Sequence, residues 1–162
     1  DKAKSINQKR LSEINSELFM SEHPRVFEKL IMALPDNAVE VVDLLKKRVT
    51  LLTDFELELK TFVEDPSYFD ISSALKVLSS ISIVDLSLIK DNIEMSGIHS
   101  IKENLYRVSQ ENNLNFGKLL QFIRLSLVGD LSGPDVFFII KMIGKNVTLR
   151  RLNLLLEKIK KQ

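Results

Sequence analysis

Apolar residues recur at helical spacing along almost the whole chain, and this periodicity restricts the fold more than any other feature. With only five glycines and four prolines in 162 residues, few positions can interrupt a helix. Side chains three or four positions apart share one face of a helix, so each periodic run can bury an apolar face. The sequence therefore predicts an all-α protein.

Proline, glycine and asparagine divide this pattern into separate segments. Proline disfavours the helical conformation of the residue before it, so Pro24 and Pro35 bound one segment. Ser100 and Glu103 have the Ser-x-x-Glu spacing of a capping box, which predicts a helix start near them. The helices that we expect cover approximately residues 7–20, 25–34, 36–52, 54–63, 70–80, 84–95, 99–114, 117–128, 134–143 and 145–161.

The segment VEDPSYFD contains the best internal boundary. Its residues Asp65, Pro66 and Ser67 form a turn signal between two helical patterns. A chain of 162 residues is long enough for one domain or two small ones. We therefore expect two consecutive small helical subdomains, covering residues 1–66 and 67–162.

Residues that commonly carry chemistry are few. Cysteine is absent, which excludes disulfides, cysteine nucleophiles and thiolate metal sites. His23 and His99 lie far apart, without further ligands at a spacing that suits zinc. Phosphate-binding loops, dinucleotide fingerprints and hydrolase or kinase signatures are also absent. We therefore predict no catalytic residue, no metal site and no cofactor site in this chain, which has the pattern of a binding module.

The sequence shows no feature of a membrane or secreted protein. No apolar run approaches the ~18 residues that span a membrane, and no signal peptide is visible. Together with the lack of cysteine, this fits a cytoplasmic protein. Because the first residue is Asp1 rather than Met, we expect the chain to be a fragment of a longer protein.

Charge is distributed unevenly along the chain. The overall charge is +1, yet residues 118–162 hold nine Lys or Arg and three Asp or Glu, a net charge of +6. Lys118 and Arg124 lie on one polar stripe of their predicted helix, and Arg150 and Arg151 on the outer face of the last helix. A basic region of this kind favours a polyanion partner, and a solvated basic helix is the alternative.

The joint RLSLVGDLSGPDVFFIIKMIGKN concentrates helix-breaking residues. Gly129 can end one helix, and Pro134 suits the first turn of the next. Ser132 and Gly133 occupy the cap region, and Gly144 ends a short helix. The free amides of a helix start attract anions, although a corner of this kind also has a purely structural explanation.

Arg48 interrupts an apolar helix face. Val41, Leu44, Leu45 and Leu52 have the spacing of one face of the predicted 36–52 helix, and Arg48 falls among them. A guanidinium on an apolar face either extends its head group to solvent or needs a partner. Both readings remain open on the residues alone.

Residues 117–152 resemble the end of bacterial glutamyl-tRNA synthetases. The family pattern of Leu-Arg, Ala-Leu-Thr-Gly, Gly-Pro, Leu-Phe-Glu, Leu-Gly-Lys and Arg-Leu corresponds here to Ile123-Arg124, Ser126-Leu127-Val128-Gly129, Gly133-Pro134, Val136-Phe137-Phe138, Ile143-Gly144-Lys145 and Arg151-Leu152. Weaker likenesses upstream are SINQKRLSEIN, VVDLLKKRVTLLTDF and FVEDPSYFD. Phe122 replaces a proline that usually precedes Leu-Arg, and Phe138 replaces the glutamate. Phe138 is then either a contact between helices or a stacking surface for a base.

This resemblance implies that the chain is the anticodon-binding region of the family. Arg124, Gly133 and Pro134 match positions that contact the first two anticodon letters, and Arg48 matches the arginine that reads the third. Candidate contacts to the RNA backbone are Lys118, Lys145, Arg150 and Arg151. The implied partner is the tRNA for glutamate, with no DNA, no membrane and a monomeric state expected.

The resemblance also implies a parent enzyme, a glutamate–tRNA ligase that uses ATP and Mg²⁺. Its nucleotide-binding signatures are absent here, so we expect the catalytic domain to lie outside this chain. The alternative from a different class is a non-enzymatic helical protein–protein scaffold with a basic C-terminal face.

Overall fold

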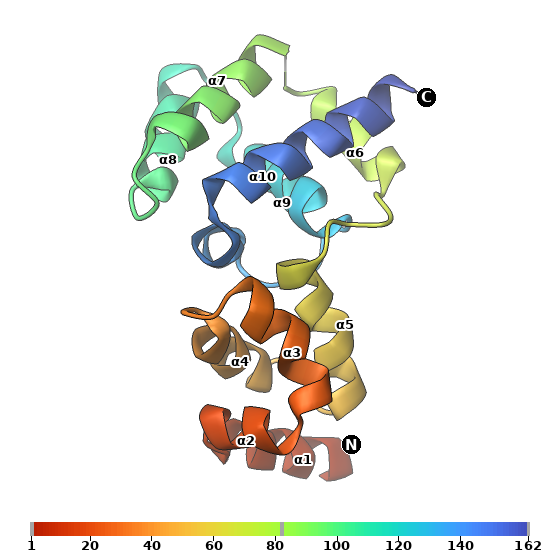
Figure 1. Cartoon of the computed structure of the whole chain (residues 1–162). Helices are drawn as coiled ribbons and strands as arrows, with labels where there is room; N and C mark the ends of the chain where they lie inside the picture. Colours follow the sequence, from red (N-terminus) through yellow and green to blue (C-terminus); the bar gives the residue numbers. More distant parts are fainter. Residues whose placement is uncertain (1, 82, 162) are drawn as a thin grey trace. The chain divides into compact units, whose positions relative to one another are not determined.

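The computed structural model describes residues 2–81 and 83–161, and within these ranges the regular secondary structure is entirely helical (Figure 1). The predicted all-α fold is therefore confirmed. The chain divides into two compact units, Asp1–Glu64 and Asp65–Gln162. None of the described helices combines the length and apolar character that a membrane span requires.

The first unit contains five helices among its described residues. They are α1 (Lys2–Glu13), α2 (Ser16–Glu22), α3 (Pro24–Ala33), α4 (Ala38–Lys46) and α5 (Leu52–Val63). Helix α3 packs against α5, and α4 contacts α1, α2 and α5. Three phenylalanines meet at the centre, with ring centroids 5.3 Å apart for Phe19 and Phe55 and 5.7 Å apart for Phe27 and Phe55. Close aromatic packing of this kind anchors α2, α3 and α5 around one core.

Local hydrogen bonds decide where the helices of the first unit begin. The single helix that we expected over residues 7–20 is wrong, because Asn15 accepts a hydrogen bond from the Leu18 N–H and starts α2. The side-chain oxygen of an asparagine in this position accepts from a backbone N–H that has no carbonyl partner in the first helical turn. Pro24 occupies the first turn of α3, as its fixed backbone angle favours.

The second unit also contains five helices in its described part. They are α6 (Ile71–Leu78), α7 (Ile83–Met95), α8 (Ile101–Glu111), α9 (Phe116–Val128) and α10 (Val136–Lys160). Helix α9 packs along α10 and also contacts α6 and α8, and α7 contacts α8 and α10. The fully buried side chains of Leu119, Phe122, Ile123 and Leu127 form the apolar face of α9. This face agrees with the helical spacing of those residues in the sequence.

Caps in the second unit follow the expected chemistry with one exception. Asn115 and Asp135 accept hydrogen bonds from backbone N–H groups at the starts of α9 and α10. Ser100 precedes α8, but its hydroxyl donates to the Gly97 carbonyl at 3.0 Å instead of capping the helix. Ser100 has φ −102° and ψ 0° rather than the extended angles of a typical N-cap, and no backbone N–H of the first turn reaches its oxygen, so the predicted Ser100–Glu103 capping box is wrong.

Gly144 interrupts α10. Its backbone angles, φ 81° and ψ 167°, are far from helical, so α10 consists of two helical segments on either side. Thr148 donates a hydrogen bond to the Gly144 carbonyl at 2.8 Å. The predicted break between residues 143 and 145 is confirmed, and glycine suits it because only glycine adopts these angles without strain.

Candidate nucleic-acid interface

Three of the candidate residues meet where α9 turns into α10. The guanidinium of Arg124 donates from Nη1 to the Pro134 carbonyl at 2.5 Å. Gly133 has φ 148°, which side-chain-bearing residues rarely adopt, and a Cβ there would lie 3.6 Å from the same Nη1, in ordinary contact with the guanidinium. We call Arg124, Gly133 and Pro134 the arginine corner.

Residues 65–70 approach the end of α9 at Gly129. Gly129 ends α9 in the left-handed conformation, and its carbonyl accepts a hydrogen bond from the Asp70 N–H at 2.8 Å. A Cβ on Gly129 would lie 2.1 Å from the Tyr68 carbonyl oxygen, which no side chain could tolerate. Glycine is therefore required both by its backbone angles and by the approach of the neighbouring segment.

Arg151 is buried, with 1% of its surface exposed. The expectation that it projects outward is wrong, since its Nε donates to Asp65 at 3.1 Å and its Nη1 to the Leu127 carbonyl at 2.9 Å. Arg150 donates to the same Asp65 oxygen at 2.8 Å. We call Asp65, Arg150 and Arg151 the Asp65 clamp, and it fastens the start of the second unit to α10 and to the end of α9.

The Asp65 clamp shifts the pKa values of Asp65 and Arg151. The hydrogen bond from Arg150, supplemented by Arg151, holds the pKa of Asp65 below its usual value, although burial opposes the shift. Burial lowers the pKa of Arg151, and Asp65 works against this change. An arginine remains charged in either case, so Asp65 and Arg151 form a charge-assisted pair at neutral pH.

The burial of Arg151 has a signal in the sequence. Thr148, Arg151, Leu152 and Leu155 are spaced at i, i+3, i+4 and i+7, which places Arg151 on the buried face. Lys46 is similarly buried on α4, where its ammonium donates to the Ile14 carbonyl at 2.6 Å. Its ammonium also pairs with Asp43 at 3.2 Å, so a lysine is buried here with both of its partners on the first unit.

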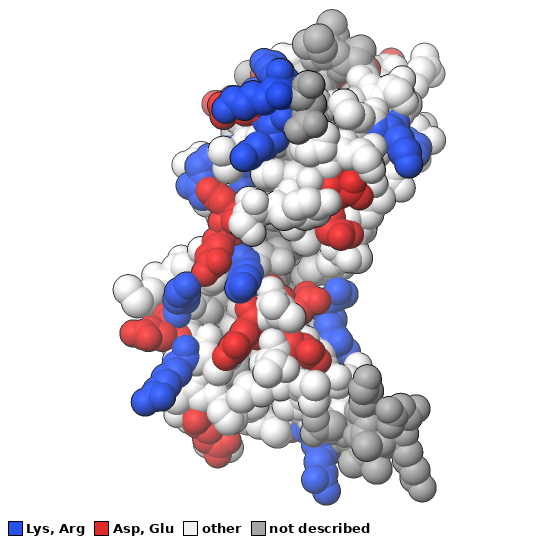
Figure 2. Space-filling model, turned by 90° about the vertical axis from the view of Figure 1, so that its right-hand side faces the viewer, with Lys and Arg blue, Asp and Glu red and all other residues white. Residues whose placement is uncertain are grey.

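The remaining candidates for backbone contacts differ in their surroundings. Lys145 donates to the carbonyls of Glu94 and Ser96, at 2.6 and 2.9 Å, and so connects α10 to the end of α7. Lys118 is half-buried in the first turn of α9, and Arg150 is exposed beside Asp65. The face drawn in Figure 2 intersperses basic and acidic groups, with one gathering of Lys and Arg atoms at its upper end.

Arg48 lies outside any helix, because α4 ends at Lys46. It is exposed and forms a loose ion pair with Glu58 of α5, at 3.7 Å between Nε and a carboxylate oxygen. The expectation that Arg48 interrupts the apolar face of a long helix is therefore wrong. Phe138 is half-buried in the first turn of α10, and Lys102 lies over the ring of its neighbour Phe137.

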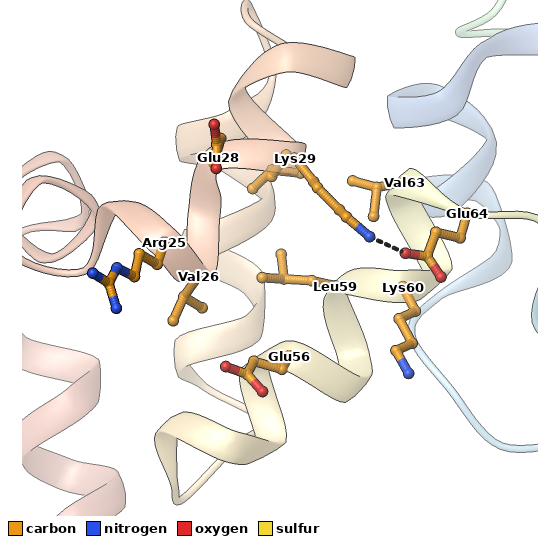
Figure 3. Close-up of a pocket in the computed structure, with 10 residues that line it drawn as sticks. Arg25, Val26, Glu28, Lys29, Glu56, Leu59, Lys60, Val63 and Glu64 are labelled. Atoms are coloured by element: carbon orange, nitrogen blue, oxygen red, sulfur yellow. Dashed lines mark hydrogen bonds and ion pairs between the residues drawn. The ribbon is translucent and has the colours of Figure 1, made fainter.

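The first unit has a groove between α3 and α5. Arg25, Glu28, Lys29, Glu56, Lys60 and Glu64 supply its charged lining, and Lys29 reaches across to Glu64 at 2.7 Å (Figure 3). This lining contains equal numbers of basic and acidic groups and none of the candidate residues. Among the described residues, no group of three or more His, Cys, Asp and Glu side chains is arranged to hold a metal ion.

The helical fold of the chain is shared with a known family of domains. The chain belongs to the anticodon binding domain family, which matches residues 23–156. The predicted resemblance to glutamyl-tRNA synthetases is confirmed by relatives of that name.

Several of these relatives cover nearly the whole chain. The glutamate–tRNA ligase of Christiangramia forsetii is 28% identical over 99% of the chain. The crystal structure of a glutamate tRNA ligase from Elizabethkingia meningosepticum, in complex with its amino acid, matches 96% of the chain at 30% identity with a TM-score of 0.85. The glutamate-tRNA synthetase from Elizabethkingia anophelis matches 95% at 29% identity with a TM-score of 0.78. The chain spans 32%, 32% and 31% of these three proteins, respectively.

Proposed function

We propose that this chain recognises the anticodon loop of the tRNA for glutamate, as part of a glutamate–tRNA ligase. The observation that carries the proposal is the arginine corner, in a chain whose residues 23–156 match the anticodon binding domain family. The parent ligase would join glutamate to its tRNA with ATP and Mg²⁺. We assign no catalytic step to the residues described here.

The arginine corner suits the reading of unpaired bases. Bases of a single-stranded loop can turn outward and present their hydrogen-bonding edges to a protein. Pro134 accepts one hydrogen bond from the Arg124 guanidinium, which carries several further N–H donors. Gly133 has no side chain to keep a base away from the backbone. We assign the first two anticodon letters to this corner.

Arg48 is our candidate for reading the third anticodon letter. Cytosine presents acceptors, O2 and N3, at its pairing edge, whereas guanine presents N–H donors there. A guanidinium has only donors, so it favours cytosine and leaves donor facing donor against guanine. The loose pair with Glu58 would be exchanged for the base on binding.

Phosphate contacts fall to the basic residues that remain accessible. Arg150 is exposed and Lys118 half-buried, and both can reach toward an RNA backbone. Lys145 would have to give up its backbone carbonyls to do so. Arg151 is withdrawn as a candidate, because it is buried in the Asp65 clamp.

The role of Arg124 is tested by Arg124→Ala and filter binding of glutamate tRNA. We expect the variant to bind more weakly and to lose its preference among tRNAs changed in the first two anticodon letters. A base contact of this type discriminates by about 5- to 140-fold. Equal binding of the variant and the parent chain to every anticodon, at one salt concentration, would remove Arg124 from the site.

The role of Arg48 is tested by Arg48→Gln with a pair of tRNAs whose anticodons end in C or in G. The unaltered chain should prefer C, and the variant should bind the two with nearly equal affinity. Glutamine carries both a donor and an acceptor, so it can pair with either base. Full retention of the preference by the variant would contradict the assignment.

A salt titration separates RNA binding from a protein–protein scaffold. The affinity for tRNA should fall linearly on a log–log plot, with a slope set by the number of phosphate contacts. A scaffold would give no tRNA complex even at low salt. Equal affinity for unrelated RNAs would support the basic face but refute base reading.

A further inference from the structure

Tyr68 is an exposed aromatic residue whose carbonyl lies against Gly129, at the end of the helix that carries Arg124. Its exposed fraction is 69%, which is high for a large ring held in an ordered segment. The other tyrosine of the chain, Tyr106, is 52% exposed and packs edge-on against Phe116, with ring centroids 5.2 Å apart. The two exposed tyrosines can therefore be compared, Tyr68 near the end of α9 and Tyr106 on α8 as its control.

The backbone of Tyr68 is fixed from both sides. Two residues later, the Asp70 N–H donates to Gly129 at 2.8 Å, and three residues earlier Asp65 is held by the Asp65 clamp. The Tyr68 carbonyl itself lies against Gly129, where no Cβ would fit. The exposed ring is thus carried by a segment that is attached at three points.

The same attachments place this segment at the arginine corner. Gly129 ends the helix that carries Arg124. Val128, the last residue of that helix, lies 3.4 Å from where a Cβ of Gly133 would be. Residues 65–70 and the arginine corner therefore adjoin the same helix end, although the sequence separates them by more than fifty positions.

We propose that the ring of Tyr68 stacks on a nucleotide base of the anticodon loop while the arginine corner reads the loop by hydrogen bonds. This inference rests on the proposed function and adds a contact to it. An aromatic ring accepts any base, because every base has a flat π-face. Tyrosine also loses little conformational freedom on binding, since its segment is fixed beforehand.

The chain contains no tryptophan, so a single Tyr68→Trp substitution provides a unique fluorescent reporter. On titration with glutamate tRNA, we expect its emission to be quenched and its ring to be protected from acrylamide. Tyr106→Trp is the matched control, and its emission should stay nearly constant. Unchanged emission and acrylamide quenching of Tyr68→Trp under conditions where tRNA is bound would overturn the proposal.

Affinity measurements separate stacking from a structural role. Tyr68→Ala should weaken tRNA binding by about 5- to 140-fold, and Tyr68→Phe should restore binding, because phenylalanine keeps the ring. The salt slope of Tyr68→Ala should match that of the parent chain, since no charge is lost. Tyr106→Ala should bind as the parent chain does.

The outcomes distinguish this inference from the proposed function. Weaker binding by Arg124→Ala with unchanged binding by Tyr68→Ala overturns the stacking contact and leaves the proposed function in place. An unaltered chain that forms no tRNA complex at low salt overturns both. A Tyr68→Phe variant as weak as Tyr68→Ala also overturns stacking, because the ring would then not be the group that matters.

Discussion

In the second unit the candidate base-reading arginine is already held in place, whereas in the first unit it is not. Arg124 donates to the Pro134 carbonyl at 2.5 Å, next to a segment fastened by the Asp65 clamp. Arg48 is exposed just beyond the end of α4, and its ion pair with Glu58 is loose at 3.7 Å. The two arginines share a proposed task but differ in how much order they have before RNA arrives.

The difference in order between Arg124 and Arg48 indicates which residues RNA binding should depend on in each unit. A side chain that is positioned in advance loses less freedom when it binds its partner. The second unit obtains this order from buried, long-range contacts, so its site should depend on residues that never touch RNA. The first unit should tolerate changes around Arg48 but depend on the arginine itself.

The largest effect is expected from removing the buried cation of the Asp65 clamp. Arg151→Met keeps much of the side-chain volume but leaves the Leu127 carbonyl without this donor and Asp65 with only Arg150. We expect the second unit to lose about 3 kcal/mol, the lower end for a broken buried pair, because Asp65 is partly exposed. Urea unfolding followed by circular dichroism measures this loss.

Arg150→Met is the matched control for Arg151→Met. It removes the other arginine on the same carboxylate, but this one is exposed. Exposed ion pairs contribute less than about 1 kcal/mol, so the control should be nearly as stable as the parent chain. Equal losses from the two variants would show that burial does not distinguish the two arginines.

A somewhat smaller effect is expected at the place where residues 65–70 meet α9. Gly129→Ala puts a Cβ against the Tyr68 carbonyl and forces alanine into a positive φ. We expect a loss of about 2 kcal/mol and weaker tRNA binding, since the neighbouring segment must shift. Gly97→Ala, whose Cβ would lie 3.4 Å from the Ser100 hydroxyl, should cost far less in the same unfolding experiment.

In the first unit, removing Glu58, the partner of Arg48, should strengthen tRNA binding and not weaken it. Glu58→Gln releases Arg48 and removes a negative charge near the RNA, so tRNA binding should strengthen by about 1.5- to 5-fold. Glu56→Gln, on the same helix, makes the same charge change without breaking the pair. An equal gain in tRNA affinity from both variants would assign the effect to overall charge and not to the release of Arg48 from Glu58.

The smallest effect is expected from acid. The pKa of Asp65 in the folded chain is held below its ordinary value of 3.8, chiefly by Arg150. The stability that this carboxylate contributes is present above pH 3.8 and is lost as the pH falls through the lower folded value. Unfolding of the second unit should therefore become easier at more acidic pH, and Asp65→Asn should flatten this dependence. Parallel pH profiles for the variant and the parent chain would contradict the role of Asp65.

Much of the fold could be predicted because local residues mark the helix ends. Pro24 starts α3, Gly129 ends α9 and Gly144 interrupts α10, each through backbone angles that the residue itself favours. The resemblance of residues 117–152 also pointed to the arginine corner, and the structure brings its members together. Their contacts with RNA remain predictions.

The rest could not be predicted because the deciding partners are distant or compete locally. Periodicity places Arg151 on the buried face of α10, but it does not reveal the acceptors at Asp65 and Leu127 that stabilise a charge there. The acceptor of buried Lys46, the Ile14 carbonyl, is equally hidden from the sequence pattern. Arg48 was misplaced for a different reason. Asp54 accepts a hydrogen bond from the Leu51 N–H and starts α5, so the chain leaves α4 before Arg48.

The Asp65 clamp also bears on how the chain is made. Asp65 and Arg151 are 86 residues apart, and synthesis at ~5–20 residues per second would place about 4 to 17 seconds between them. The long-range hydrogen bonds of the first unit close shorter loops, of 35 residues for Lys29 with Glu64 and 39 for Gln8 with Lys47. On a ribosome, the first unit can therefore complete its contacts before Arg151 is synthesised and can pair with Asp65. A pause in translation before Arg151 would lengthen the time during which Asp65 lacks this partner.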